Sequence, residues 1–168
     1  MYDLSVILLV LCVVVSAIKL SVMSFSKSLI VAVVWLILLI VAAPFIAQKN
    51  PVTIESLGGC GLWHQLLWIE GVLMITYCLG FPSSSWAYRL LSWFPGIMCG
   101  VSFYFMLTYS FIKFIDCNFA FCGVIVGLVA ALALLIPSVV LRNLVNIKAM
   151  IVNLIFALEI VMLLLTAL

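Results

Sequence analysis

Charged side chains are scarce in this sequence: they make up 7% of its 168 residues, whereas hydrophobic residues make up 69%. About a quarter of the residues of a typical soluble domain are charged, so this chain lacks the side chains that would cover a water-facing surface. Its net charge of +2 is also too small for a nucleic-acid-binding surface. The composition therefore indicates an integral membrane protein surrounded by lipid.

Catalytic and metal-binding motifs are missing as well. His64 is the single histidine, so a bis-histidine haem site is excluded. No second histidine is available for an intramembrane serine–histidine catalytic pair. The sequence contains no Cys-x-x-Cys pair, no Gly-x-Ser-x-Gly elbow and no Gly-Lys-Ser/Thr phosphate loop. We therefore expect a protein that is not an enzyme and that has no metal site and no cofactor.

Six apolar stretches are long enough to cross a bilayer, for which about 20 residues are needed. We expect an all-α, polytopic membrane protein that forms one transmembrane domain over residues 1–168, with no extramembrane domain. The first stretch lacks the basic residues of a signal peptide, with Asp3 in their place, so we interpret it as a retained span. The predicted helices are 4–23, 28–47, 64–80, 95–115, 119–141 and 147–168.

A short seventh segment, residues 86–94, mixes tryptophan, tyrosine and arginine with leucine. Such a mixture is typical of a helix lying in the headgroup region. Pro82 breaks the preceding helix, and a serine of the run 83–85 is suited to cap the segment.

The positions of lysine and arginine predict an orientation, because these residues gather in cytoplasmic turns. Five lie at the turns after the first, third and fifth helices: Lys19, Lys27, Arg89, Arg142 and Lys148. The opposite side has only Lys49 and Lys113. We therefore expect both termini on the outer or periplasmic side of a bacterial inner (plasma) membrane or an organellar inner membrane.

Two carboxylates fall inside predicted spans. Glu70 and Glu159 lie near the middle of two helices that run in the same direction, so they have similar depths in the bilayer. A charged carboxylate facing lipid at this depth costs roughly 2.5–3.5 kcal/mol, so both should face protein, water or a partner. Tyr77 follows Glu70 on the same helix face. These three residues are therefore candidates for ion-linked or partner-contacting groups. The alternative is that they only form hydrogen bonds between helices of this chain.

A second polar stripe lies on the first helix, where Ser5, Cys12, Ser16 and Lys19 share one face. We expect interhelical hydrogen bonds from this stripe. Lys19 is close to a helix end, so we expect its side chain to extend to the membrane interface, as for Lys113.

Small residues four apart occur in two predicted helices and let helix backbones approach closely. The pairs are Gly96 with Gly100 and Gly123 with Gly127. They lie at different depths, so each groove should meet another helix, from this chain or from a partner. Two outer-loop cysteines, Cys60 and Cys117, are placed either to form a disulfide or to remain free thiols.

These features favour a small non-enzymatic subunit of a larger inner-membrane complex, driven by or conducting protons or sodium ions. Its partners would be membrane lipids and other integral membrane subunits. A stand-alone transporter or substrate-binding membrane subunit is the first alternative, and an assembly or stability factor is the second.

Overall fold

Nearly all of the residues that the structure describes are helical. The computed structural model describes residues 2–47, 62–80, 85–114, 118–145 and 147–167, and these ranges contain no β-strand. The prediction of an all-α protein is therefore confirmed. The helices of these ranges are α1 (Tyr2–Val22), α2 (Phe25–Ala47), α4 (Leu62–Leu79), α5 (Trp86–Trp93), α6 (Ile97–Lys113), α7 (Phe119–Leu144) and α8 (Lys148–Ala167).

Each predicted long helix corresponds to one of these helices, and the short segment 86–94 forms α5. Ser85 caps α5 by accepting a hydrogen bond from the Tyr88 backbone N–H, at 3.3 Å from nitrogen to hydroxyl oxygen, so the predicted serine cap is confirmed. The main difference is at the start of α6. It begins at Ile97 rather than Pro95, and Phe94–Gly96 separates it from α5.

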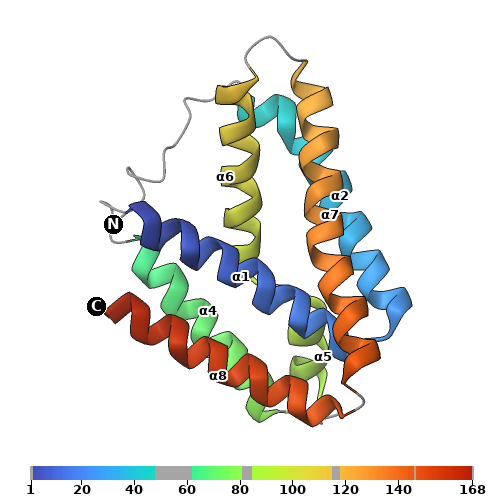
Figure 1. The fold of residues 1–168 in the computed structure, drawn as a ribbon, viewed down its shortest axis with the longest axis vertical. Coiled ribbons are helices and arrows are strands. Elements are labelled where there is room, and N and C mark those ends of the chain that lie inside the picture. The colour runs from blue at the N-terminus through green and yellow to red at the C-terminus, as the bar shows by residue number, and fades with distance from the viewer. Residues whose placement is uncertain (1, 48–61, 81–84, 115–117, 146, 168) are drawn as a thin grey trace.

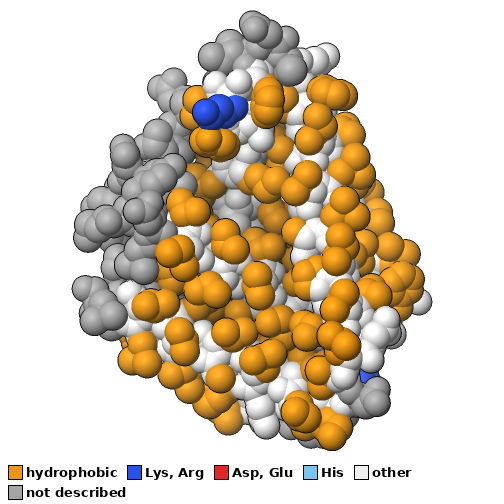
Figure 2. Space-filling model, in the orientation of Figure 1, with side chains coloured by type: hydrophobic (Ala, Val, Ile, Leu, Met, Phe, Trp, Pro, Cys, Tyr) orange, Lys and Arg blue, Asp and Glu red, His pale blue; other side chains and the backbone are white. Residues whose placement is uncertain are grey.

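Apolar helices make this chain a multi-pass membrane protein. Within the described ranges, four apolar helical stretches are long enough to cross a membrane: Phe25–Ile46, Tyr88–Lys113, Phe119–Leu144 and Lys148–Leu165. The second of these includes α5, the break and α6. Shorter apolar stretches occur in α1 and α4, at Val6–Val22 and Gln65–Leu79. Hydrophobic side chains cover most of the face shown in Figure 2, as expected for a surface in contact with lipid.

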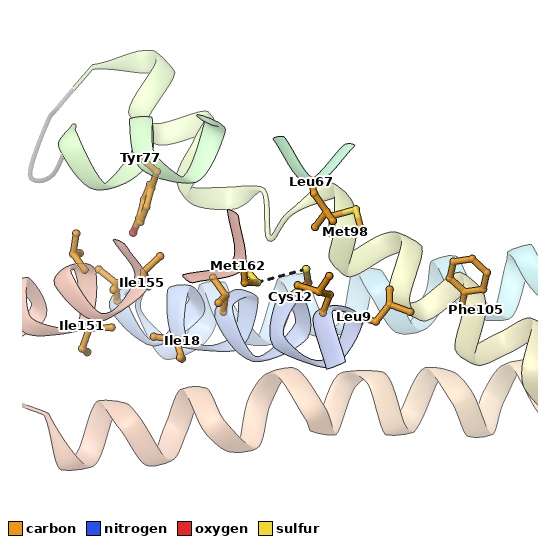
Figure 3. Close-up of a cluster of buried hydrophobic side chains, with 14 residues drawn as sticks. Leu9, Cys12, Ile18, Leu67, Tyr77, Met98, Phe105, Ile151, Ile155 and Met162 are labelled. Carbon is orange, nitrogen blue, oxygen red and sulfur yellow. Dashed lines mark hydrogen bonds between the residues drawn. The ribbon is translucent and has the colours of Figure 1, made fainter. Parts of the chain in front are cut away.

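Helix α1 lies at the centre of the helix arrangement (Figure 1). It packs against α8 and α6 as well as α7, while α4 packs on α8 and α2 packs on α7. One face of α1 joins α4 and α8 in a buried apolar cluster that contains Cys12, Ile155 and Met162 (Figure 3). Another face joins α2, α6 and α7 through Ala17 and Leu20. The two ends of the chain lie on the same side of the molecule in Figure 1.

The glycines of α6 and α7 meet a common neighbour, α2. A Cβ atom on Gly100 would lie 2.8 Å from the Trp35 ring, and one on Gly123 would lie 2.7 Å from the Ala43 Cβ. Gly127 faces the backbone of Leu36. Both small-residue faces are therefore filled by a helix of this chain, so they give no reason to expect a partner helix at these positions.

Arg142 ties the end of α7 to the turn between α1 and α2. Its guanidinium donates to the backbone carbonyls of Leu20 and Ser21 and to the Ser28 hydroxyl. The two carbonyls belong to the last turn of α1, where helical partners are lacking and a positive charge is favoured by the helix dipole. This arginine thus fixes the end of the central helix.

Replacing Gly123 with valine should destabilise the protein by about 1–3 kcal/mol, because the new side chain would overpack the contact with Ala43. The measurement is the unfolding free energy of the purified protein in detergent micelles. Leu128→Ile is the control, since Leu128 is on the same helix but is 50% exposed. Equal stability of the two variants would contradict this packing of α7 on α2.

Candidate intramembrane polar site

The candidate site is built around the break between α5 and α6. Pro95 has no backbone N–H, and Gly96 adopts φ +144° and ψ 151°, a conformation available almost only to glycine. Helix geometry is therefore interrupted within an apolar stretch. The break exposes the carbonyl groups of Phe94 and Pro95 and the first N–H groups of α6, all of which need partners in an environment without water.

Helix α1 supplies donors for the two carbonyls. The Lys19 ammonium donates to the Phe94 carbonyl. The Ser16 hydroxyl shares its one hydrogen between the Pro95 carbonyl at 3.0 Å and the Cys12 carbonyl of its own helix at 2.8 Å. Ser16 and Lys19 are three residues apart, so they lie on the same face of α1. The expectation of interhelical hydrogen bonds from this stripe is confirmed at these two positions.

Helix α4 supplies the acceptor for the N–H groups. Glu70 Oε2 accepts a hydrogen bond from the Met98 backbone N–H, in the first turn of α6, at 2.7 Å. The N-terminus of a helix carries partial positive charge, so a carboxylate is stabilised there. Gly96 is needed for this approach, because a Cβ atom at residue 96 would collide with Glu70 Oε1.

Lys19 is buried, with 1% of its surface exposed. Its ammonium lies 4.8 Å from the centre of the Tyr77 ring, a distance at which a cation–π interaction forms. Tyr77 in turn stacks on Tyr88 of α5, with ring centres 5.2 Å apart. The prediction that Lys19 extends to the interface is therefore wrong: an aromatic ring and a backbone carbonyl inside the bundle bind it instead.

Glu159 adds a second carboxyl to this group. It is 2% exposed, and its Oε1 atom has no hydrogen-bond partner. It lies within range of electrostatic interaction with both Glu70 and Lys19. Helices α4 and α8 come close at this depth, where a Cβ atom on Gly71 would lie 2.8 Å from Leu163. The neighbouring turn of α8 carries Met162, whose sulfur is 3.9 Å from the Cys12 thiol (Figure 3).

The structure brings Glu70, Tyr77 and Glu159 together around Lys19. Gly96, which the sequence suggested as a groove residue within a helix, instead precedes α6 and accommodates the Glu70 carboxyl, because its φ of +144° ends helical geometry. Gly100, Gly123 and Gly127 lie elsewhere, against α2. Cys60 and Cys117 are outside the described residues.

Sequence reasoning did not assign Lys19 and Ser16 to this site. The polar stripe on the first helix was the signal that could have done so, since it places a hydroxyl and an ammonium on one face. The acceptors of these donors could not be predicted, because the sequence Phe94-Pro95-Gly96 does not show that two of its carbonyls face α1.

The buried group holds one ammonium and two carboxyls. The Lys19 ammonium and the Glu70 carboxyl form hydrogen bonds with backbone groups at the break, whereas one oxygen of Glu159 has no hydrogen-bond partner. Among the described residues, no three or more histidine, cysteine, aspartate or glutamate side chains are placed to hold a metal ion. The arrangement therefore places three ionisable side chains, two acidic and one basic, in a buried part of the bundle.

No family model, curated protein or solved structure matches this chain. Function therefore has to be inferred from the chemistry of the site itself.

Replacing Gly96 with alanine should destabilise the protein by about 1–3 kcal/mol, since alanine does not tolerate this backbone conformation and its Cβ would displace Glu70. Unfolding in detergent micelles measures the effect. Gly71→Ala is the comparison for crowding without backbone strain: its Cβ would lie 2.8–3.0 Å from the Cδ and Cγ atoms of Leu163, which would have to shift, but Gly71 has helical backbone. A Gly96→Ala variant as stable as the wild type would show that Glu70 does not depend on this glycine.

Proposed function

We propose that this chain is a small non-enzymatic subunit of a larger inner-membrane complex, in which Glu70, Lys19 and Glu159 form a proton-linked group. The observation that carries the proposal is the excess of carboxyl over ammonium in a buried cluster, with one Glu159 oxygen lacking a hydrogen bond.

Charge balance is the first step. With all three side chains ionised, the group would carry one uncompensated negative charge in a medium that penalises charge strongly. One added proton or cation removes that charge. Glu70 accepts a hydrogen bond from the Met98 N–H in the first turn of α6, an interaction that favours its ionised form. The neutralising species therefore belongs on Glu159.

The surroundings of Glu159 favour a proton over a metal cation. Hard cations are held by several oxygen ligands, but the nearby carbonyls of Phe94 and Pro95 already accept from Lys19 and Ser16. Cys12, Cys78 and Met162, which also lie in this region, offer sulfur. A proton needs only one carboxyl oxygen.

The proposed topology has six spans, with α1 and α4 crossing as well as the longer helices. Both termini would face the outer side and the basic turns the cytoplasm or matrix, in agreement with the positive-inside rule. The common location of the chain ends in Figure 1 supports this arrangement. Such a topology leaves little of the chain outside the bilayer. We therefore propose that its partners are other integral membrane subunits.

A stand-alone transporter or substrate-binding subunit is the second candidate. Discontinuous helices whose ends face charged groups are a feature of secondary transporters, and the ends of α5 and α6 face Lys19 and Glu70 in this way. A cavity of about 340 Å³ is lined in part by Tyr77, although Glu70 and Glu159 do not line it. A third candidate is an assembly factor, in which the carboxyls only hold helices together.

Infrared spectroscopy tests the charge balance. Wild type at neutral pH should show the C=O stretch of one buried protonated carboxyl. The band should disappear in Glu159→Gln, and also in Glu70→Gln, where Glu159 would ionise beside Lys19. Lys19→Met should instead give a second protonated carboxyl, because no cation remains. Glu55→Gln is the matched control, at a glutamate that the sequence places in the polar stretch after the second helix.

A wild-type protein without a protonated carboxyl, or a band unaffected by Glu159→Gln, would refute the proton-linked group. Circular dichroism of each variant confirms that it remains folded.

Affinity purification from native membranes tests the partner part of the proposal. The chain should copurify with other integral membrane proteins in fixed stoichiometry, and Glu159→Gln should preserve the complex while reducing its proton-driven activity. A chain that purifies alone, and whose Glu→Gln variants lose uptake of a solute, would favour the transporter. Intact activity in both Glu→Gln variants would favour the assembly factor.

A further inference from the structure

A cavity of about 340 Å³ lies at the end of the molecule where α1 ends and α2 and α8 begin. Its volume falls at the lower end of the range for small-ligand sites. It is separate from the break between α5 and α6, although Tyr77 contributes to both. Its polar lining consists of Lys27, Lys148, Ser24, Ser92, Tyr77 and Tyr88.

The lining is electropositive. It contains two lysines and no carboxylate among the described residues. Lys27 lies in the first turn of α2 and Lys148 is the first residue of α8. These turns contain no acidic residue, although helix N-termini favour negative charge. Two lysines at the starts of two helices therefore line one cavity, and its described lining residues include no carboxylate.

The surroundings of the cavity are apolar. Lys27 lies 5.5 Å from the centre of the Trp93 ring, and Trp93 itself is 40% exposed. Leu90 of α5, Leu144 at the end of α7 and Ile147 just before α8 are also exposed. A ligand that combines an anionic group with hydrocarbon would be bound by both kinds of surface.

We propose that this cavity binds a phosphate-bearing anion, and specifically the headgroup of an anionic phospholipid. The two ammonium groups would bind the phosphate oxygens, and the serine and tyrosine hydroxyls would contact the phosphate or the polar part of the headgroup. The acyl chains would lie on the exposed leucine and tryptophan side chains. Basic pockets between membrane helices on the cytoplasmic side bind anionic lipid headgroups in this manner, and the proposed topology places the cavity on that side.

The test is a lipid titration of the purified full-length chain in detergent micelles, with thermal unfolding as the readout. Phosphatidylglycerol should raise Tm in a saturable way, whereas phosphatidylcholine with the same acyl chains should not. Lys27→Gln and Lys148→Gln should each weaken the apparent affinity for phosphatidylglycerol about fivefold. Lys113→Gln is the matched control, because Lys113 is an exposed lysine at the end of α6, beside Tyr109.

A second set of titrations uses inorganic phosphate and glycerol phosphate. It distinguishes binding of a lipid headgroup from binding of a soluble phosphate. Stabilisation by these soluble anions, with no preference for phosphatidylglycerol over phosphatidylcholine, would overturn the assignment to a lipid. An equal response to both lipids, unchanged in the Lys27 and Lys148 variants and without any response to phosphate, would overturn the site. These outcomes do not depend on the protonation of Glu159, which the infrared experiment addresses separately.

Discussion

Backbone hydrogen bonding at the Phe94–Gly96 break is the constraint on which the polar interior of this protein depends. A helix that is interrupted among apolar side chains presents carbonyl and N–H groups that water cannot reach, and each unsatisfied group costs several kcal/mol. Here α1 provides the donors and α4 provides the acceptor. The positions of these two helices relative to α6 are thus fixed by hydrogen bonds, in addition to the apolar packing around them.

The same constraint explains why charged residues are present in a chain that has so few of them. The Phe94 carbonyl needs a donor that can reach across from another helix, and the long side chain of Lys19 supplies one. The N-terminus of α6 favours a negatively charged acceptor, and Glu70 supplies it. The two charges then compensate one another, so the break contains a matched pair. Tyr77 adds an aromatic surface beside the ammonium.

The sequence predicted the helices well because apolar runs of about 20 residues have few other interpretations. That Glu70 and Glu159 have similar depths in the bilayer stays a prediction from the rise per residue of two helices running in the same direction, whereas the burial of both side chains is observed. The break was not predictable in the same way. Pro95 fits the first turn of a helix, Gly96 fits a packing groove, and only the approach of Glu70 distinguishes the observed structure from these alternatives. Lys19 was misplaced for a related reason, since a lysine near a helix end is buried only when an acceptor lies beside it.

Glu159 is the member of the group that the break does not require. If it served only to hold helices together, its oxygens would be expected to find donors on α1 or α4, as those of Glu70 do on α6. Instead Oε1 is buried without a hydrogen-bond partner, within range of electrostatic interaction with Glu70 and Lys19. An apolar side chain at residue 159 would leave the hydrogen bonds of the break intact and would avoid the cost of burying a third ionisable group. This difference from Glu70 is the reason for proposing that Glu159 holds a proton.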